Sequence, residues 1–277
     1  MTTHTDEILV LGGTGKTGRR LVHALRATGH AVRAASRSGE TRFDWTDRHT
    51  WAAALDGATA VYLVAPEDPA LADVFVEQAT EAGVRRFVAL SARGIGDLPA
   101  DVFQGMAAAE RAVRTSGVAW TILQPNNFSQ NFSEDMWHAP LLSGRLALPV
   151  GSAPEPFVDA RDIADVAAAL LTSDRHQGRT FVLSGPRAVT FTTAVATIAE
   201  ASGRAMRYAE ITPEEFRDLV LAAGWPEAAA TELNAMYAAM RSGAWAEPGD
   251  GVQRVLGREP IDFATYAAGA ATAGAWS

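Results

Sequence analysis

The fold is decided by the segment Val10-Leu11-Gly12-Gly13-Thr14-Gly15-Lys16-Thr17-Gly18. An apolar run at residues 8–11 leads into its glycines, and a helical pattern of apolar residues starts at Leu21. A strand, a glycine turn and a helix in this order are typical of a dinucleotide site. Glycine lets the backbone approach a diphosphate, and the N-terminus of the helix holds its charge. The segment therefore predicts a dinucleotide-binding site, with an ordinary strand-to-helix turn as the alternative.

Gly15, Lys16 and Thr17 also look like the end of the phosphate loop of nucleoside triphosphatases. That pattern needs a glycine five residues before Gly15, where this chain has Val10. The sequence therefore does not favour nucleoside triphosphate chemistry.

Residues 31–37 predict a second strand, and its end indicates which dinucleotide is bound. An acidic residue about 20 positions after the glycines usually binds a free ribose 2′-hydroxyl. No acid lies between Gly29 and Ser38, where Ser36 and Arg37 stand instead. A guanidinium suits a 2′-phosphate, and a hydroxyl adds a hydrogen bond. We therefore expect NADP, with NAD as the alternative; a solvated surface arginine is the other interpretation of Arg37.

The composition excludes several classes of site. The 277 residues carry a formal net charge of −8, so we expect no nucleic acid partner. The chain has no cysteine and its six histidines are dispersed, so we expect neither thiol chemistry nor a metal site. No apolar run approaches the roughly 18 residues that span a membrane, and residues 1–7 have no signal-peptide pattern. We therefore expect a cytoplasmic protein.

Predicted strands alternate with predicted helices along the first two thirds of the chain. Strands are predicted at residues 41–45, 58–64, 86–91, 119–123 and 180–183, and helices at residues 50–55, 70–82, 101–115 and 159–172. This alternation predicts an α/β fold with a doubly wound, mainly parallel Rossmann sheet. Residues 192–201, 213–223 and 227–240 predict further helices. We expect an NAD(P)-binding domain at residues 1–183, with a pocket-lining insertion at about 128–157, and a smaller, mostly helical lobe at 184–277.

The chain resembles the NmrA-like group of atypical short-chain dehydrogenases/reductases over nearly its whole length. The resemblance rests on the opening glycine segment, the strand 32–34 leading to Arg37, and the segments 117–123, 125–128 with Asn131 and Phe132, and 157–164. One departure is Gln124, where the group often has arginine. The resemblance implies NAD(P)H-dependent quinone reductases, tailoring reductases of aromatic natural products, or redox-sensing regulators that only bind the cofactor.

Ligands of doubly wound sheets bind outside the carboxyl ends of the strands. These ends and the resemblance predict the following cofactor-binding residues: Gly12, Gly13, Thr14, Gly15, Lys16, Thr17, Gly18, Ser36, Arg37, Asp44, Val64, Ala65, Pro66, Ser91, Pro125, Asn126 and Phe128. Asp44 is expected to accept from the adenine amino group, as the corresponding acid does in similar proteins. Its alternative role is in a turn at the strand end.

The usual Tyr-x-x-x-Lys pair of short-chain reductases is absent, because Lys16 is the only lysine and residues 103–107 have no ionisable group. Ser91 matches the position of the usual catalytic serine, although capping of local backbone is an equal alternative. Hydride addition to a quinone leaves a phenolate-like oxygen with a pKa of roughly 10, which water can protonate. The chain is therefore expected to reduce quinones or conjugated aromatic carbonyls rather than simple ketones.

The remaining candidates lie further along the chain. His138, beside Glu134 and Asp135, is a candidate proton donor, with a solvated loop as the alternative. Predicted substrate-binding residues are Asn127, Phe132, Trp137, Tyr237 and Met240, most of which suit a flat aromatic ligand and equally suit a plain core. Asp159 and Asp162 are predicted to cap a helix. Residues 89–93 lack the glycines of a hydrolase nucleophile elbow.

The sequence thus predicts an NADP-dependent oxidoreductase acting on a small aromatic or quinone substrate. A sensor that binds NAD(P) without catalysis is the alternative. A further alternative is a reductase that supplies reduced substrate to an oxygenase partner. We expect a monomer or a homodimer and no membrane partner.

Overall fold

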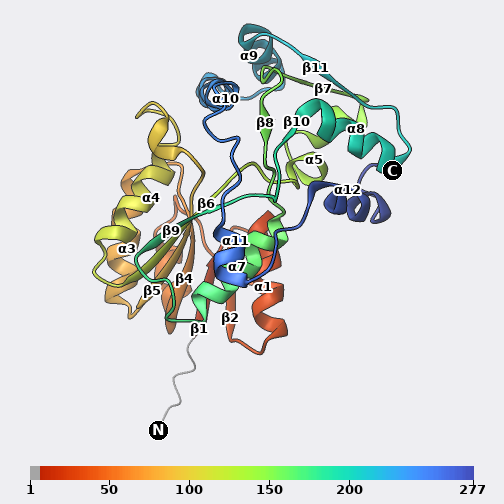
Figure 1. Ribbon diagram of the computed structural model, residues 1–277. Coiled ribbons are helices and arrows are strands. Elements are labelled where there is room, and N and C mark those ends of the chain that lie inside the picture. Colours follow the sequence, from red (N-terminus) through yellow and green to blue (C-terminus); the bar gives the residue numbers. More distant parts are fainter. Residues whose placement is uncertain (1–6) are drawn as a thin grey trace.

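The computed structural model describes residues 7–277 and contains a seven-stranded sheet with helices on both faces (Figure 1). The strand order is β3-β2-β1-β4-β5-β6-β9, and every neighbouring pair is parallel. The strands are β1 (Glu7–Leu11), β2 (Val32–Ser36), β3 (Thr41–Arg42), β4 (Ala58–Val64), β5 (Arg86–Leu90), β6 (Ala119–Pro125) and β9 (Arg179–Leu183). The predicted doubly wound α/β fold is confirmed. Residues 1–6, which bear on the predicted lack of a signal peptide, lie outside the described residues.

Two layers of helices bury the two faces of this sheet. One layer consists of α1 (Lys16–Ala27), α7 (Ala160–Leu171) and α11 (Gly251–Leu256), and the other of α2 (His49–Leu55), α3 (Ala70–Glu81) and α4 (Gln104–Thr115). Along β4, Val61 and Leu63 face the α3 layer, whereas Tyr62 faces the α7 layer, and all three are fully buried. Burial on both faces explains why this strand reads as an unbroken apolar run.

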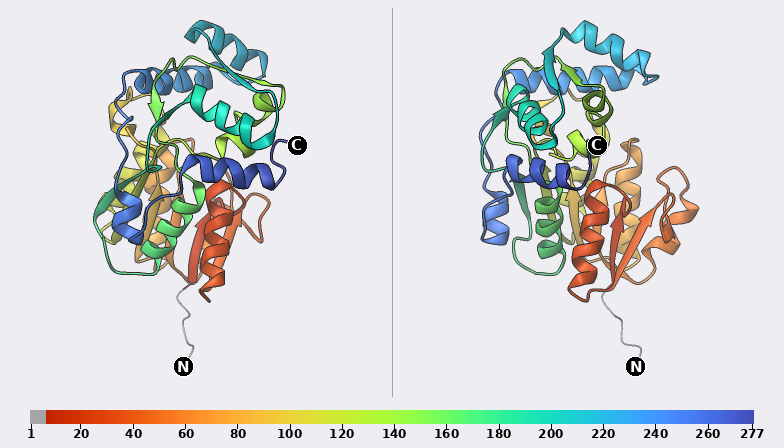
Figure 2. Two further views of the ribbon diagram at one scale, coloured as in Figure 1. Left: turned by 45° about the vertical axis from the view of Figure 1, so that its right-hand side comes forward. Right: turned by 90° about the vertical axis from the view of Figure 1, so that its right-hand side faces the viewer.

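An upper lobe sits over the carboxyl ends of the strands (Figure 2). Its elements are α5 (Asn131–Glu134), α6 (His138–Leu142), β7 (Arg145–Leu148), β8 (Pro154–Glu155), β10 (Val189–Thr190), α8 (Phe191–Ser202), β11 (Arg207–Glu210), α9 (Pro213–Ala222), α10 (Glu227–Arg241) and α12 (Phe263–Thr272). Strand β7 pairs with β11 and β8 with β10, so the segment 131–155 and the later residues share one core. The division into residues 1–183 and 184–277 stays a prediction; α11 packs against α7 rather than in this lobe.

Several elements differ from the sequence-based expectation, and β3 covers only Thr41–Arg42 of the strand predicted at residues 41–45. Strand β6 extends through Pro125, because this last residue needs only its carbonyl, which accepts from Arg93 N at 3.0 Å. Helix α4 starts at Gln104 instead of residue 101, since Phe103 takes a left-handed conformation with φ of 49°. The alanine- and glycine-rich segment 266–274, where no helix is predicted from the sequence, is mostly helix α12. Within residues 7–277, no helix is long and apolar enough to cross a bilayer.

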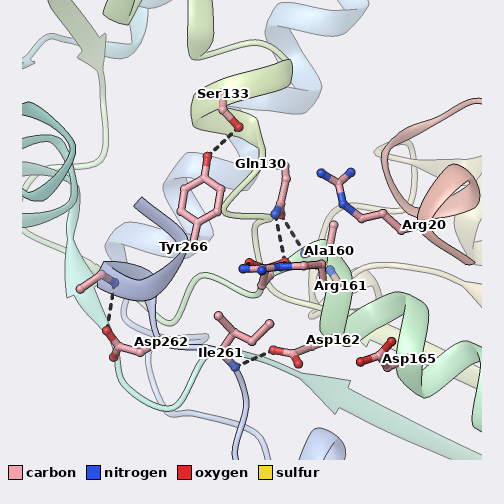
Figure 3. Close-up of polar contacts among 12 residues, drawn as sticks. Arg20, Gln130, Ser133, Ala160, Arg161, Asp162, Asp165, Ile261, Asp262 and Tyr266 are labelled. Carbon is pink, nitrogen blue, oxygen red and sulfur yellow. Dashed lines mark hydrogen bonds and ion pairs between the residues drawn. The ribbon is translucent and has the colours of Figure 1, made fainter. Parts of the chain in front are cut away.

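Two buried aspartates fix the N-terminal part of α7, and Figure 3 shows one of them, Asp162, with its contact to Ile261. Asp159 caps the helix as predicted, accepting from Arg161 N at 2.8 Å, and it also accepts from Gln130 Nε2 at 3.0 Å. Asp162 does not cap the helix: its carboxylate accepts from Ile261 N at 2.7 Å and from Arg258 Nη1 at 2.6 Å. Asp159 therefore ties α7 to the segment that enters the upper lobe, and Asp162 ties it to the loop before α12.

We predict that Asp162→Asn lowers the free energy of unfolding by about 1–3 kcal/mol, because one partner of a buried charge-assisted contact is lost. The matched control is Asp165→Asn, which removes a half-exposed carboxylate paired with the same Arg258. This control substitution should lower the free energy of unfolding by at most about 1 kcal/mol. Urea titration of both variants measures the difference, and equal losses would contradict the anchoring role of Asp162.

The same aspartate gives a pH dependence with a defined sign. Burial raises the pKa of Asp162 above its ordinary 3.8, and contacts with Ile261 N and Arg258 only partly offset this. The folded state therefore holds this proton more tightly than the unfolded state, and its contribution to stability falls as the pH rises from 3.8 through the raised pKa. The difference in the free energy of unfolding between wild type and Asp162→Asn should therefore decrease as the pH rises through that range. Urea titrations at several pH values measure this difference, and an increase would contradict the assignment.

Candidate functional site

The glycine loop between β1 and α1 is closely packed. Gly12 has φ of 65°, and its carbonyl accepts from Gly15 N at 2.8 Å. A Cβ on Gly18 would lie 2.1 Å from the Gly12 oxygen, so only glycine fits there. Helix α1 therefore starts directly against the loop, and the loop lies next to Val64 at the end of β4. This is the point in the sheet where the strand order reverses.

The N-terminus of α1 is open to an anion. Its N-cap is Gly15, no side chain caps it, and its first turn has no acidic residue. Thr14 and Gly15 at the tip of the loop are exposed. The free N–H groups and the positive end of the helix dipole therefore face outward without a competing carboxylate in that turn.

Two predicted cofactor-binding side chains follow β2. The Ser36 hydroxyl is buried and has no hydrogen-bond partner among the described residues. The Arg37 side chain is exposed and forms no ion pair with any carboxylate of residues 7–277. Asp44 lies within electrostatic reach of Arg37; hydrogen bonds from Thr46, and to a lesser degree the charge of Arg37, lower its pKa. The structure thus brings these three predicted residues to one corner of the sheet.

Ser91 lies directly after β5, with its main-chain N–H bonded to Leu123 O at 2.8 Å. Its side chain is 4% exposed, and its hydroxyl has no partner in the described part of the chain. Nearby, the first turn of α4 packs so closely that a Cβ on Gly105 would lie 1.8 Å from the Pro66 oxygen. The helix segment expected to hold the Tyr-x-x-x-Lys pair in related reductases therefore has a bare glycine against the loop after β4.

Lys16 joins α1 to the upper lobe instead of pointing into solvent. Its Nζ donates to Asn131 Oδ1 at 2.6 Å, pairs with Asp135 and lies 5.3 Å from the centre of the Phe128 ring. Burial opposes ionisation of Glu134, but its ion pairs with Arg20 and Arg19 more than offset this and lower its pKa. The acidic cluster at residues 134–135 is therefore exposed but ion-paired to α1.

A buried polar network follows β6, and sequence reasoning missed its centre. Glu155 is 1% exposed, and its Oε1 accepts from Asn126 Nδ2 at 3.0 Å, from Asn127 N at 2.9 Å and from Asn127 Nδ2 at 3.2 Å. Burial raises the pKa of Glu155, and these N–H groups only partly offset the rise. No local signal marks Glu155, because its burial depends on the pairing of β8 with the distant β10.

Arg93 is the second residue that the sequence analysis did not assign. Its Nη1 donates to Asn126 Oδ1 at 3.0 Å and to Glu247 O at 2.5 Å. Trp245 packs against the next residue, Gly94, and the indole N–H of Trp245 is buried without a partner among residues 7–277. Arg93 follows Ser91 by two residues past the strand end, which is the signal that could have identified it.

Several predicted substrate residues lie in the core of the upper lobe. Phe132, Trp137 and Tyr237 are at most 1% exposed, and Trp137 Nε1 donates to Tyr237 Oη at 3.2 Å. Met240 is also buried, although its sulfur accepts from Asn127 Nδ2 at 3.5 Å. His138 Nε2 lies 2.7 Å from Ala275 O. Substrate and catalytic roles for these residues stay predictions, and no cluster in the described chain could hold a metal ion.

Comparison with known proteins agrees with this geometry. The family model of the NmrA-like family matches residues 4–263. An NAD(P)H azoreductase of Xenophilus azovorans is 32% identical over 280 residues, which cover 94% of this chain and 96% of that protein.

Two solved structures share the fold. An NADPH-dependent quinone oxidoreductase of Escherichia coli superposes with a TM-score of 0.79 at 20% identity, covering 95% of this chain and 98% of that one. The negative transcriptional regulator NmrA, solved with NAD, superposes with a TM-score of 0.76 at 15% identity, covering 98% and 97% of the two chains. The chain belongs to the NmrA-like family.

Proposed function

We propose that this protein is an NADP-dependent oxidoreductase that reduces a quinone or a conjugated aromatic carbonyl by hydride transfer. The observation that supports this most directly is the open N-terminus of α1 behind the glycine loop, with Arg37 beside it at the end of β2. Together they offer main-chain amides for a diphosphate and a guanidinium for one further phosphate.

The residues present fit this cofactor. The hydroxyls of Ser36 and Ser91 are both buried without partners in the described chain, one on each side of the point where the strand order reverses. Ser36 would then bond the ribose phosphate, and Ser91 the nicotinamide amide or the substrate oxygen. When bound, the reduced cofactor supplies the hydride; the protein side chains bind and orient it.

The names of related proteins support the same reaction class. The azoreductase and the quinone oxidoreductase are both named for reduction of conjugated acceptors with a nicotinamide cofactor. Conjugation matters because the only lysine lies in α1, so no Tyr-x-x-x-Lys pair is available to protonate an alkoxide. Reduction of a quinone leaves an oxygen with a pKa of roughly 10, which needs no such pair.

A redox sensor that binds the cofactor without turnover is the second candidate. The regulator NmrA, named as a negative transcriptional regulator and solved with NAD, favours it. Purified protein should be titrated with NADPH and NADH, and then mixed with NADPH and a panel of quinones and aliphatic ketones. Oxidation of NADPH by quinones supports the enzyme, whereas tight binding with no turnover on any acceptor supports the sensor.

Three further expectations stay predictions. They are the supply of reduced substrate to an oxygenase partner, a cytoplasmic location, and a monomeric or homodimeric state.

We predict that Arg37→Asp weakens NADPH binding at least about tenfold and changes NADH binding much less, because only NADPH carries the 2′-phosphate. The control is Arg175→Asp, an exposed arginine between α7 and β9 at the opposite edge of the sheet. Equilibrium titration measures both affinities. Equal losses for the two cofactors would contradict the assignment of Arg37.

We predict that Ser91→Ala lowers kcat for quinones about tenfold or more if its hydroxyl donates to the substrate oxygen, since charge develops there during reduction. If the hydroxyl instead bonds the nicotinamide amide, the dissociation constant of NADPH rises and kcat changes less. Steady-state kinetics together with cofactor titration separates the two roles. If neither kcat nor the dissociation constant of NADPH changes, Ser91 has no role in the site and only terminates the strand.

A further inference from the structure

Two arginines without an ion-pair partner among the described residues lie at the carboxyl edge of the sheet, Arg37 after β2 and Arg93 after β5. In the strand order, β2 lies next to β1 and β5 next to β4, so the two arginines flank the β1–β4 switch point on opposite sides. A dinucleotide placed across this point has its adenosine half near β2 and its nicotinamide half near β4 and β5. Arg93 therefore lies at the end where the substrate meets the nicotinamide.

The guanidinium of Arg93 is held by one nitrogen only. Nη1 donates to Asn126 Oδ1 and to Glu247 O, whereas Nε and Nη2 donate to no described residue. The side chain is only half-buried, and these two nitrogens are absent from the set of buried polar atoms without partners. The Nε–Nη2 edge is thus the free edge of the fork, and this edge binds a carboxylate through two parallel hydrogen bonds.

The surroundings keep this fork in place. Arg93 N donates to Pro125 O, and the next residue, Gly94, packs under Trp245 so closely that a Cβ would lie 2.1 Å from the indole nitrogen. The charges of Glu155 and Glu247 both offset part of the effect of burial on Arg93, but neither carboxylate forms an ion pair with it, and Glu155 Oε1 is already bonded to the two asparagines. Burial disfavours the charged guanidinium and lowers the pKa of Arg93. Binding of an anion from solvent would therefore give the guanidinium the ion-pair partner that it lacks among the described residues.

We propose that Arg93 is a substrate-binding residue that recognises an acidic oxygen group, a carboxylate or a phosphate ester, on the quinone or aromatic substrate. This inference rests on the proposed oxidoreductase function. It makes an anionic substituent, and not the reducible ring alone, the basis of substrate selection.

The test uses a matched pair of substrates, 3-(1,4-naphthoquinon-2-yl)propanoate and its methyl ester. The two-carbon spacer separates the carboxylate from the ring, so the two quinones have similar reactivity. A difference between their rates then reports the effect of the negative charge on binding. With NADPH and wild-type protein, kcat/KM for the acid should exceed that for the ester by about tenfold or more. Arg93→Gln should reduce this ratio to near unity, and Arg93→Lys should keep only part of it, because lysine retains the charge without the fork.

Arg175→Gln is the matched control and should keep the wild-type ratio. Circular dichroism and NADPH titration establish that each variant is folded and binds cofactor. Equal rates on acid and ester in wild type, or an undiminished preference in Arg93→Gln, would overturn the proposal. The preference in Arg93→Lys decides the question if Arg93→Gln does not fold.

Failure of the proposed function has a separate signature. If neither quinone is reduced, binding of acid and ester to the protein saturated with NADP⁺ is measured by calorimetry. Tighter binding of the acid to wild type, lost in Arg93→Gln, would support Arg93 as an anion-binding residue without a reductase. Equal binding of the two compounds to wild type would reject it.

Discussion

The contact between the start of α1 and the carbonyl of Gly12 is the constraint on which the rest of the structure depends. Because Gly18 has no side chain, the helix begins directly at the edge of the sheet and its N–H groups are left facing the crevice. That position fixes where negative charge can bind. In the function that we propose, the residues after β2 select the cofactor, and those after β5 and β6 lie beside its other half.

The sheet and its helices could be predicted because their determinants are local. The run at residues 58–64 is apolar throughout since β4 is covered on both faces, and the glycines of the first loop leave a recognisable spacing. The upper lobe was predicted less well. Its strands β7, β8, β10 and β11 have two to four residues each and pair only across long stretches of chain, so their sequences show no clear alternation.

Some residues of the candidate site could likewise be predicted from local sequence, and others could not. Ser36, Arg37 and Ser91 follow strands that the pattern identified, and the structure places them at the expected edge. Glu155 and Arg93 belong to a network assembled from four separate segments of the chain, and the sequence near either residue does not show which groups will surround it. The aromatic residues at positions 132, 137 and 237 have the composition of a flat-ligand pocket, and the structure buries all three in the core of the upper lobe, because a side-chain type alone does not fix exposure.

The interleaved strand pairing of the upper lobe also constrains the order of folding. Residues 7–125 supply six neighbouring strands of the main sheet, which can associate while synthesis continues. In contrast, β7 pairs with a strand about sixty residues later, and buried Trp276 bonds Phe132 O at 2.9 Å. The apolar side chains of residues 132–157 thus lack part of their partners until residue 276 has been made. During this interval the nascent chain exposes its largest aromatic cluster, so this lobe is where chaperone binding and aggregation would concentrate.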